Sequence, residues 1–360
     1  MSGGAHIVGD LEHIRGLVRV AKLYHEEGLS EQEIARLVGT SRSTVSRMLT
    51  EAKRRGIVRI SFAKENRTIT ENENELRERF RLKDVVTVPA LGDGSEGRLK
   101  ERLGAAAAAY VSEMLQPGQL LGISWGTTLF EVALKLRPHR VPGTRVVQLN
   151  GSVGQGRVSY LGARVLEIIA AKLGAQAFSF PAPAIVGDPA FCEALVREPS
   201  IAEALEAARK CDVAVFTVGI VDPSCVLVET GYLTADDIRG LRARGAVGDI
   251  CSRFFDGCGQ ICDPDLDRRT LGLHLSDLAS IPIKILVAGG QRKAAGILGA
   301  LRAGYAEVLI TDETTASEVA AMARGAASVR PNATDAADTV AVHARTTLGN
   351  RSRCGGGVAS

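Results

Sequence analysis

The chain has 360 residues, of which 45% are hydrophobic and 24% are charged. This length and composition are typical of a globular protein with two domains and a substantial core. No run of about 18 apolar residues is present, so we expect no membrane-spanning segment. Residues 1–10 lack the charged start and apolar core of a signal peptide. The formal net charge of +3 is too small to indicate nucleic-acid binding by itself.

Seven cysteines are scattered along the chain, and their odd number favours a reducing compartment. Cys251, Cys258 and Cys262 are close in sequence but lack the paired spacing of a zinc site. We therefore expect a cytoplasmic protein with structural thiols, no metal and no cofactor.

The first predicted helix covers residues 11–27, and a second begins at residue 30. Ser30 is a candidate N-cap with Glu33 at capping-box spacing, and Gly39 can adopt the positive φ that ends this second helix. The apolar residues predicted to face inward in the first helix are Leu17, Val20, Ala21 and Tyr24, and those in the second are Ile34, Leu37 and Val38.

A third helix follows the turn at Gly39, with Thr40 or Ser41 as its N-cap. Val45, Leu49 and Ala52 fall at helical spacing and are predicted to face inward. The remaining positions form an outward face rich in Arg and hydroxyl groups, namely Arg42, Ser43, Ser46, Arg47 and Thr50.

The spacing of Ala35, Gly39 and Val45 is that of a helix-turn-helix. Six cations and one acidic residue lie within residues 41–60, as expected of an element that contacts phosphates. The alternative is an ordinary helical hairpin with a solvated basic face. The candidate DNA-binding residues are Thr40, Ser41, Arg42, Ser43, Ser46, Arg47, Lys53 and Arg54, of which those near the start of the helix are better placed for base edges.

The predicted DNA-binding domain covers residues 1–62 and includes a β-run at 57–62 that fits one strand of a small wing. Residues 63–83 are predicted to be a polar hinge followed by a charged helix, with Thr70 and Glu73 at capping-box spacing. The final residues, 331–360, are polar and without periodicity, so we expect a disordered tail.

Residues 84–330 alternate between short apolar β-runs and helical segments. The β-runs fall at 85–90, at the starts of 119–129 and 145–154, and at 214–220, 283–290 and 307–313. This alternation predicts an α/β domain with a mostly parallel sheet covered on both faces. In such a sheet, ligands bind outside the carboxyl ends of the strands.

Three loops that follow predicted strands carry Gly and polar residues. Residues 122–128 place Thr127 and Thr128 at a helix start, where backbone N–H groups favour an anion, although the loop could equally be a simple strand–helix turn capped by Thr127. Residues 148–152 offer amides and a hydroxyl that suit sugar hydroxyl groups. Residues 288–293 place Lys293 three positions after Gly290, within reach of a phosphate. If these loops converge, they indicate a phosphorylated ligand.

A fourth element, residues 245–256, contains Asp249 just after a Gly-rich turn. This carboxylate could accept hydrogen bonds from sugar hydroxyls or merely cap a helix, and the sequence leaves both open.

Together, the helix-turn-helix and the stretches GISWGTTL, VVQLNGS, VGI, GAVGDICSRFFD and LVAGGQRKAAGILGALRAGYAEVLITDE resemble the SorC/DeoR-type sugar-binding transcriptional regulators of bacteria. The resemblance covers about residues 11–325. It implies an operator-binding domain and a Rossmann-like effector domain with the fold shared by phosphosugar isomerases and CoA transferases. It also implies a phosphorylated sugar or related metabolite as effector and a homo-oligomer, commonly a tetramer.

By motif match, the resemblance also assigns effector-binding residues. The phosphate would be taken by Gly126, Thr127, Thr128 and Lys293, and the sugar by Asn150, Gly151 and Asp249, with Cys225 lining the pocket. Gly290 is also counted among the effector-binding residues.

Two other functions remain open on the sequence alone. One is a phosphosugar isomerase with an accessory DNA-binding domain, for which Asp249 is the convincing candidate base. The other is a constitutive DNA-binding protein with a vestigial pocket.

Overall fold

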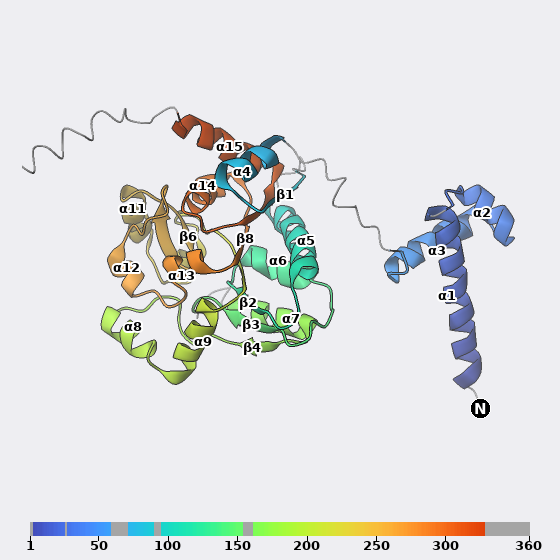
Figure 1. Ribbon diagram of the computed structural model, residues 1–360, viewed down its shortest axis with the longest axis horizontal. Helices are drawn as coiled ribbons and strands as arrows, with labels where there is room; N and C mark the ends of the chain where they lie inside the picture. The colour runs from blue at the N-terminus through green and yellow to red at the C-terminus, as the bar shows by residue number, and fades with distance from the viewer. Residues whose placement is uncertain (1–2, 26, 59–70, 90–94, 154–160, 328–360) are drawn as a thin grey trace, which may run out of the picture. The chain divides into compact units, whose positions relative to one another are not determined.

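The computed structural model describes residues 3–25, 27–58, 71–89, 95–153 and 161–327 (Figure 1). The chain forms two compact units, Met1–Thr68 and Ile69–Ser360. None of the helices within the described ranges is long and apolar enough to cross a membrane. Residues 59–62 of the predicted wing strand at 57–62, the hinge with Thr70 and the tail at 331–360 lie outside the described residues.

The first unit consists of α1 (Gly3–His25), α2 (Glu31–Val38) and α3 (Arg42–Arg54). The predicted start of α2 is confirmed, because Ser30 and Glu33 form a capping box. Gly39 has a φ of 69° and ends this helix. Of the two candidate caps of α3, Ser41 is the one whose side chain accepts the Thr44 N–H.

The core of this unit is formed by the predicted inward faces, with two exceptions. Ile34, Val45 and Val20 pack together in a buried cluster. Leu37 is 59% exposed, because Ile34 and Ala35 define the buried face of α2 and Leu37 lies to one side of it. Tyr24 is 39% exposed in the last turn of α1, where its ring contacts His25 edge-on.

The second unit is built on a sheet of seven strands, and the predicted parallel arrangement is confirmed. Their order is β1-β9-β8-β5-β2-β3-β4, and every pairing is parallel. The strands are β1 (Asp84–Val88), β2 (Leu120–Ile123), β3 (Arg145–Gln148), β4 (Gln176–Phe178), β5 (Val213–Phe216), β8 (Ile283–Val287) and β9 (Val308–Asp312).

Alternate strand residues enter two separate cores, one on each face of the sheet. Leu120 and Ala214 face one core, whereas Leu121 and Val213 face the other. The helices over the first face are α4 (Glu71–Phe80), α9 (Pro199–Arg209), α13 (Leu275–Ser280), α14 (Ala294–Arg302) and α15 (Glu313–Ala327). Those over the second are α5 (Glu96–Met114), α6 (Thr127–Lys135) and α7 (Leu161–Leu173). A layer of helices therefore covers each face (Figure 1).

Short helices outside these two layers belong to smaller clusters. They are α8 (Pro189–Leu195), α10 (Val226–Glu229), α11 (Ala235–Ala243) and α12 (Pro264–Arg268). The 3-10 turn Gln291–Lys293 has no buried residue and links β8 to α14.

Residues 246–256 form a hairpin of β6 (Ala246–Ile250) and β7 (Arg253–Asp256). The two turn residues, Cys251 and Ser252, have φ of 53° and 67°, the backbone of a tight hairpin turn without glycine. The helix-cap alternative for Asp249 is therefore wrong, because Asp249 lies within β6 and pairs with Phe254.

Candidate functional site

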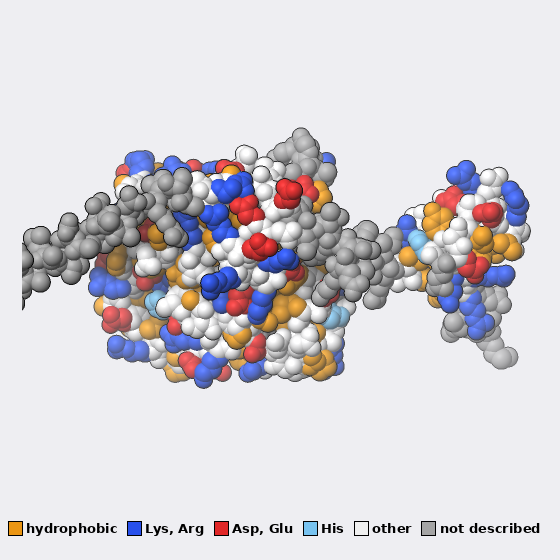
Figure 2. Space-filling model, turned by 45° about the horizontal axis from the view of Figure 1, so that its top comes forward, with side chains coloured by type: hydrophobic (Ala, Val, Ile, Leu, Met, Phe, Trp, Pro, Cys, Tyr) orange, Lys and Arg blue, Asp and Glu red, His pale blue; other side chains and the backbone are white. Residues whose placement is uncertain are grey.

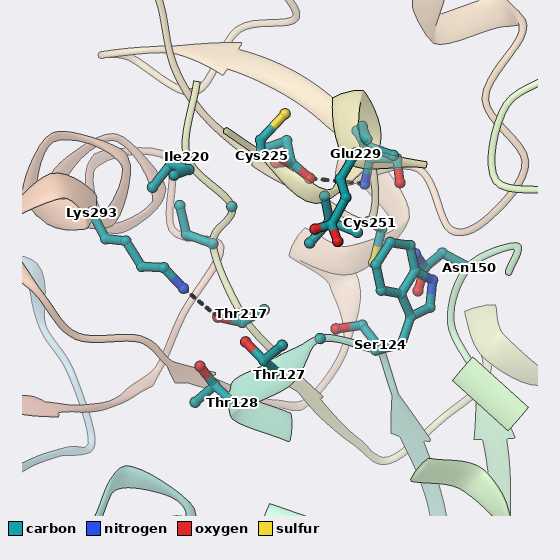
Figure 3. Close-up of a pocket in the computed structure, with 18 of the residues that line it drawn as sticks. Ser124, Thr127, Thr128, Asn150, Thr217, Ile220, Cys225, Glu229, Cys251 and Lys293 are labelled. Atoms are coloured by element: carbon teal, nitrogen blue, oxygen red, sulfur yellow. Dashed lines mark hydrogen bonds between the residues drawn. The ribbon is translucent and has the colours of Figure 1, made fainter. Parts of the chain in front are cut away.

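A pocket opens beyond the carboxyl ends of β2, β3, β5 and β8 and is closed on one side by the β6–β7 hairpin (Figure 3). Its volume is about 260 Å³. This is near the lower end of the range for small-molecule sites, which begins at about 300 Å³. Of the predicted effector-binding residues, the lining includes Gly126, Thr127, Thr128, Asn150, Cys225, Asp249 and Lys293.

The start of α6 supplies one wall of the pocket. No side chain caps this helix at Gly126, so its first N–H groups are available to an anion. Thr127 and Thr128 line the pocket beside them, and Thr217 joins them from the loop after β5. These three hydroxyls lie close to one another in Figure 3.

Lys293 approaches the same point from the turn after β8. Its Nζ lies 3.5 Å from Thr217 Oγ1. Burial lowers the pKa of this ammonium from 10.5 to about 8, and the neighbouring Lys100 adds to the shift, whereas Asp249 and Glu96 oppose it. The half-buried ammonium thus lies near three hydroxyls, an arrangement that suits an anion.

Gly290 does not line the pocket. Its N–H donates to Asp312 Oδ2 at 2.9 Å and to Thr315 Oγ1 at 2.8 Å. Gly290 therefore has a structural role, because these two hydrogen bonds hold the turn that leads to Lys293.

Asp249 faces the pocket from β6. Its Oδ2 accepts the Ser252 N–H at 3.2 Å. Burial raises the pKa of this carboxyl from 3.8 to about 6, and the Ser252 bond and the Lys293 charge limit the rise. Gly219 leaves the space that Asp249 occupies, since a Cβ at Gly219 would collide with the carboxylate.

Asn150 and Gly151 follow β3 and differ in their surroundings. Asn150 is 2% exposed and lines the pocket, and its Oδ1 has no hydrogen-bond partner within the described parts of the chain. Gly151 is not in the lining. Its carbonyl accepts the Trp125 Nε1–H at 2.7 Å, and its Cα packs against Pro183 without room for a Cβ.

Cys225 lines the pocket at the start of α10, where burial raises the pKa of its thiol. The structure also brings in polar and aromatic side chains that were not among the predicted effector-binding residues. They are Glu96, Lys100, Ser124, Trp125, Thr217, Ser224, Glu229, Cys251 and Ser252. Lys100 bonds Glu96 at 2.6 Å one turn away on α5, and no loop motif marks this pair.

The candidate DNA-binding face lies on α3, and Lys and Arg side chains are visible on this unit in Figure 2. The side chains of Arg42, Ser43, Arg47, Lys53 and Arg54 are exposed, whereas Thr40 and Ser46 are half-buried. Ser41 is exposed but serves as the N-cap, and Arg42 Nε pairs with Glu31 at 3.2 Å. No cluster of metal-ligating side chains is found among the residues that the structure describes.

The raised pKa of Asp249 predicts a pH-dependent stability difference. A carboxyl whose folded-state pKa exceeds its unfolded value stabilises the fold less as the pH rises between the two values, here 3.8 and about 6. Asp249→Asn should therefore gain stability relative to wild type as the pH rises from about 4.5 to 6.5. Urea unfolding of both proteins across that range measures the difference, and a constant difference would contradict the assignment.

Two family models match the chain. One, described as "Putative sugar-binding domain", matches residues 64–321, and a Crp-like helix-turn-helix domain matches residues 17–79. The fold and these matches define a transcriptional regulator with a helix-turn-helix DNA-binding domain and a sugar-binding domain.

The chain is similar to characterised regulators over most of its length. It is 34% identical to the deoxyribonucleoside regulator of Bacillus subtilis, over 83% of this chain and 95% of the relative. It is 32% identical to the transcriptional regulator LsrR of Escherichia coli, over 84% and 93%. The full-length sorbitol operon regulator SorC from Klebsiella pneumoniae has the same fold, with a TM-score of 0.71 and 27% identity over 85% of this chain and 98% of that one. The chain belongs to the SorC/DeoR family of sugar-binding transcriptional regulators.

Proposed function

We propose that a phosphorylated sugar binds this pocket and controls operator binding by the helix-turn-helix unit. The observation that supports this most directly is the position of Lys293 Nζ beside Thr217, Thr127 and Thr128 at the uncapped start of α6. A phosphate there would receive N–H and O–H donors and a cation. Asp249 and Asn150, which line the same pocket, offer acceptors for sugar hydroxyls.

A thermal-shift screen of phosphosugars against their unphosphorylated counterparts tests the effector class. A ligand at one hundred times its dissociation constant stabilises the folded state by about 2.7 kcal/mol. We expect at least one phosphosugar to raise the melting temperature and its unphosphorylated form to do so far less. Equal shifts from both forms would argue against phosphate recognition.

We further propose that α3 reads the operator, with Arg47 at base edges and Lys53 on the phosphate backbone. Both side chains are exposed on α3, and Val45 and Leu49 hold the opposite side of the helix in the core. Arg47→Ala should relax specificity at one or two base positions by about 1–3 kcal/mol. Lys53→Ala should weaken binding to all sequences alike and flatten its salt dependence.

Binding assays with operator variants at several salt concentrations separate the two roles. Wild-type binding that ignores sequence, or that persists without residues 1–62, would remove α3 as the reader.

We also propose a homo-oligomer, with a tetramer as the expected state. One helix-turn-helix contacts too few base pairs for genomic selectivity, so two or more units should read repeated half-sites. Sedimentation of residues 63–330 at micromolar concentration tests this, and a monomer would contradict it.

A further inference from the structure

The carboxylate of Glu229 projects into the pocket. Glu229 was not among the predicted site residues, and it has no role in the proposed phosphate site. It is the last residue of α10, and its backbone N–H donates to the Cys225 carbonyl at 3.1 Å. Figure 3 shows its side chain pointing into the cavity, between Cys251 and the threonines of α6. Within the described ranges, no cation or hydrogen-bond donor engages this carboxylate.

The other two carboxylates of the pocket are already engaged. Glu96 pairs with Lys100 at 2.6 Å, and this pairing holds the pKa of Glu96 below its usual range. Asp249 accepts the Ser252 N–H and lies near the Lys293 ammonium. Of the three pocket carboxylates, Glu229 is therefore the one whose side chain has no partner among the described residues and is left entirely to a ligand.

Asn150 supplies a second unused acceptor. Its side chain is 2% exposed, and its Oδ1 is buried without a partner among the described residues. In Figure 3 it lies across the pocket from Lys293. A buried acceptor without a donor is unfavourable. A ligand that donates an O–H group to Asn150 Oδ1 should therefore bind more tightly than one that does not.

We propose that Glu229 and Asn150 recognise adjacent hydroxyl groups at the end of the effector opposite its phosphate. This rests on the proposed phosphosugar function and narrows it to sugars that keep both hydroxyls. The carboxylate accepts from one or both hydroxyls through short, charge-assisted hydrogen bonds, and Asn150 Oδ1 accepts from the second. Cys225 and Cys251 remain protonated, because burial raises the pKa of both thiols, and add no competing negative charge.

This site discriminates against deoxy sugars. A pocket that is built to accept a hydroxyl rejects a ligand that lacks it, because its buried polar atoms then stay unpaired. Glu229 is exposed, so we expect a preference of about tenfold or more, well below the largest known cases. The inferred preference is for sugars that keep both hydroxyls. It thus differs from the deoxyribonucleoside specificity in the name of the Bacillus subtilis regulator, which is 34% identical to this chain.

Isothermal titration of the full-length protein tests the inference with matched probes. The probes are D-ribose 5-phosphate and D-glucose 6-phosphate, each with its 2-deoxy counterpart, and inorganic phosphate. The proteins are wild type, Glu229→Ala, Glu229→Gln and the control Glu203→Ala, whose glutamate is exposed on α9 and outside the pocket lining.

We expect at least one hydroxylated sugar phosphate to bind wild type and Glu203→Ala at least tenfold more tightly than its 2-deoxy form. Glu229→Ala should bring that ratio close to one while leaving the affinity for inorganic phosphate unchanged, and Glu229→Gln should give an intermediate ratio. Equal affinities within both pairs, or a ratio that survives Glu229→Ala, would overturn the inference. If inorganic phosphate binds and none of the sugar phosphates does, the inference is overturned but the phosphate site is retained. If no probe binds at all, the result also counts against the proposed function.

Discussion

Replacing Arg253 by alanine is expected to lower the free energy of unfolding of the second unit by about 3–5 kcal/mol, the cost of breaking a buried ion pair. The side chain lies on β7 and is 1% exposed. Its guanidinium donates to the carbonyls of Leu273, Thr270 and Gly272 at 3.0 Å each. It also donates to the Asp267 carbonyl at 2.9 Å and to Asp267 Oδ1 at 2.5 Å. The substitution would leave these buried acceptors without donors and open a cavity.

The loss should extend to the pocket, because the segment that Arg253 holds supports the loop containing Asn150. The Gly151 N–H donates to the Leu271 carbonyl at 3.0 Å, and the Leu273 N–H donates to the Leu149 carbonyl at 2.8 Å.

The matched control is Arg268→Ala. Arg268 is exposed and pairs with Asp265, and such a surface pair contributes at most about 1 kcal/mol. Urea unfolding of both variants measures the difference, and equal losses would contradict the role given to Arg253.

Lys293→Ala is expected to weaken effector binding by about tenfold or more, since a hydrogen bond to a charged group contributes roughly 1.5–3 kcal/mol. The ammonium is half-buried beside Thr217, and a bound phosphate would raise its pKa again from about 8. Operator binding without effector should stay nearly unchanged, because the DNA-reading helix belongs to the other unit.

Lys210→Ala provides the control for Lys293→Ala, because Lys210 is an exposed lysine paired with Glu206 on α9. Isothermal titration of the best ligand from the thermal-shift screen compares the three proteins. Equal affinities for wild type and Lys293→Ala would remove the phosphate assignment, as would an unphosphorylated sugar that binds as tightly as its phosphate.

The sequence predicted the parts of the fold that depend on local chemistry. Ser30, Glu33 and Gly39 act within a few residues of one another, so their spacing fixed both ends of α2. The alternation of strands and helices predicted the parallel sheet, and the rule for the carboxyl ends of strands placed Thr127, Asn150 and Lys293 at one pocket.

Features that depend on distant packing could not be predicted in the same way. The hairpin around Asp249 turns at Cys251 and Ser252, which are not residues that signal a left-handed turn. Gly290 was expected to bind the effector, but its N–H donates to Asp312 and Thr315 in the next strand and helix. Glu229 enters the pocket from a short helix that no motif marks.

Operator binding measured with and without the phosphosugar effector, for wild type and Lys293→Ala, tests the central claim most directly. The effector is the phosphosugar that the thermal-shift screen selects, added at a concentration that saturates wild type. For wild type we predict a change in operator affinity of about 5–150-fold, the usual range of coupling between two sites. Lys293→Ala at the same concentration should respond much less, and the unphosphorylated sugar should have little effect on either protein. An operator affinity that a saturating phosphosugar leaves unchanged, or an undiminished response in Lys293→Ala, would contradict the account.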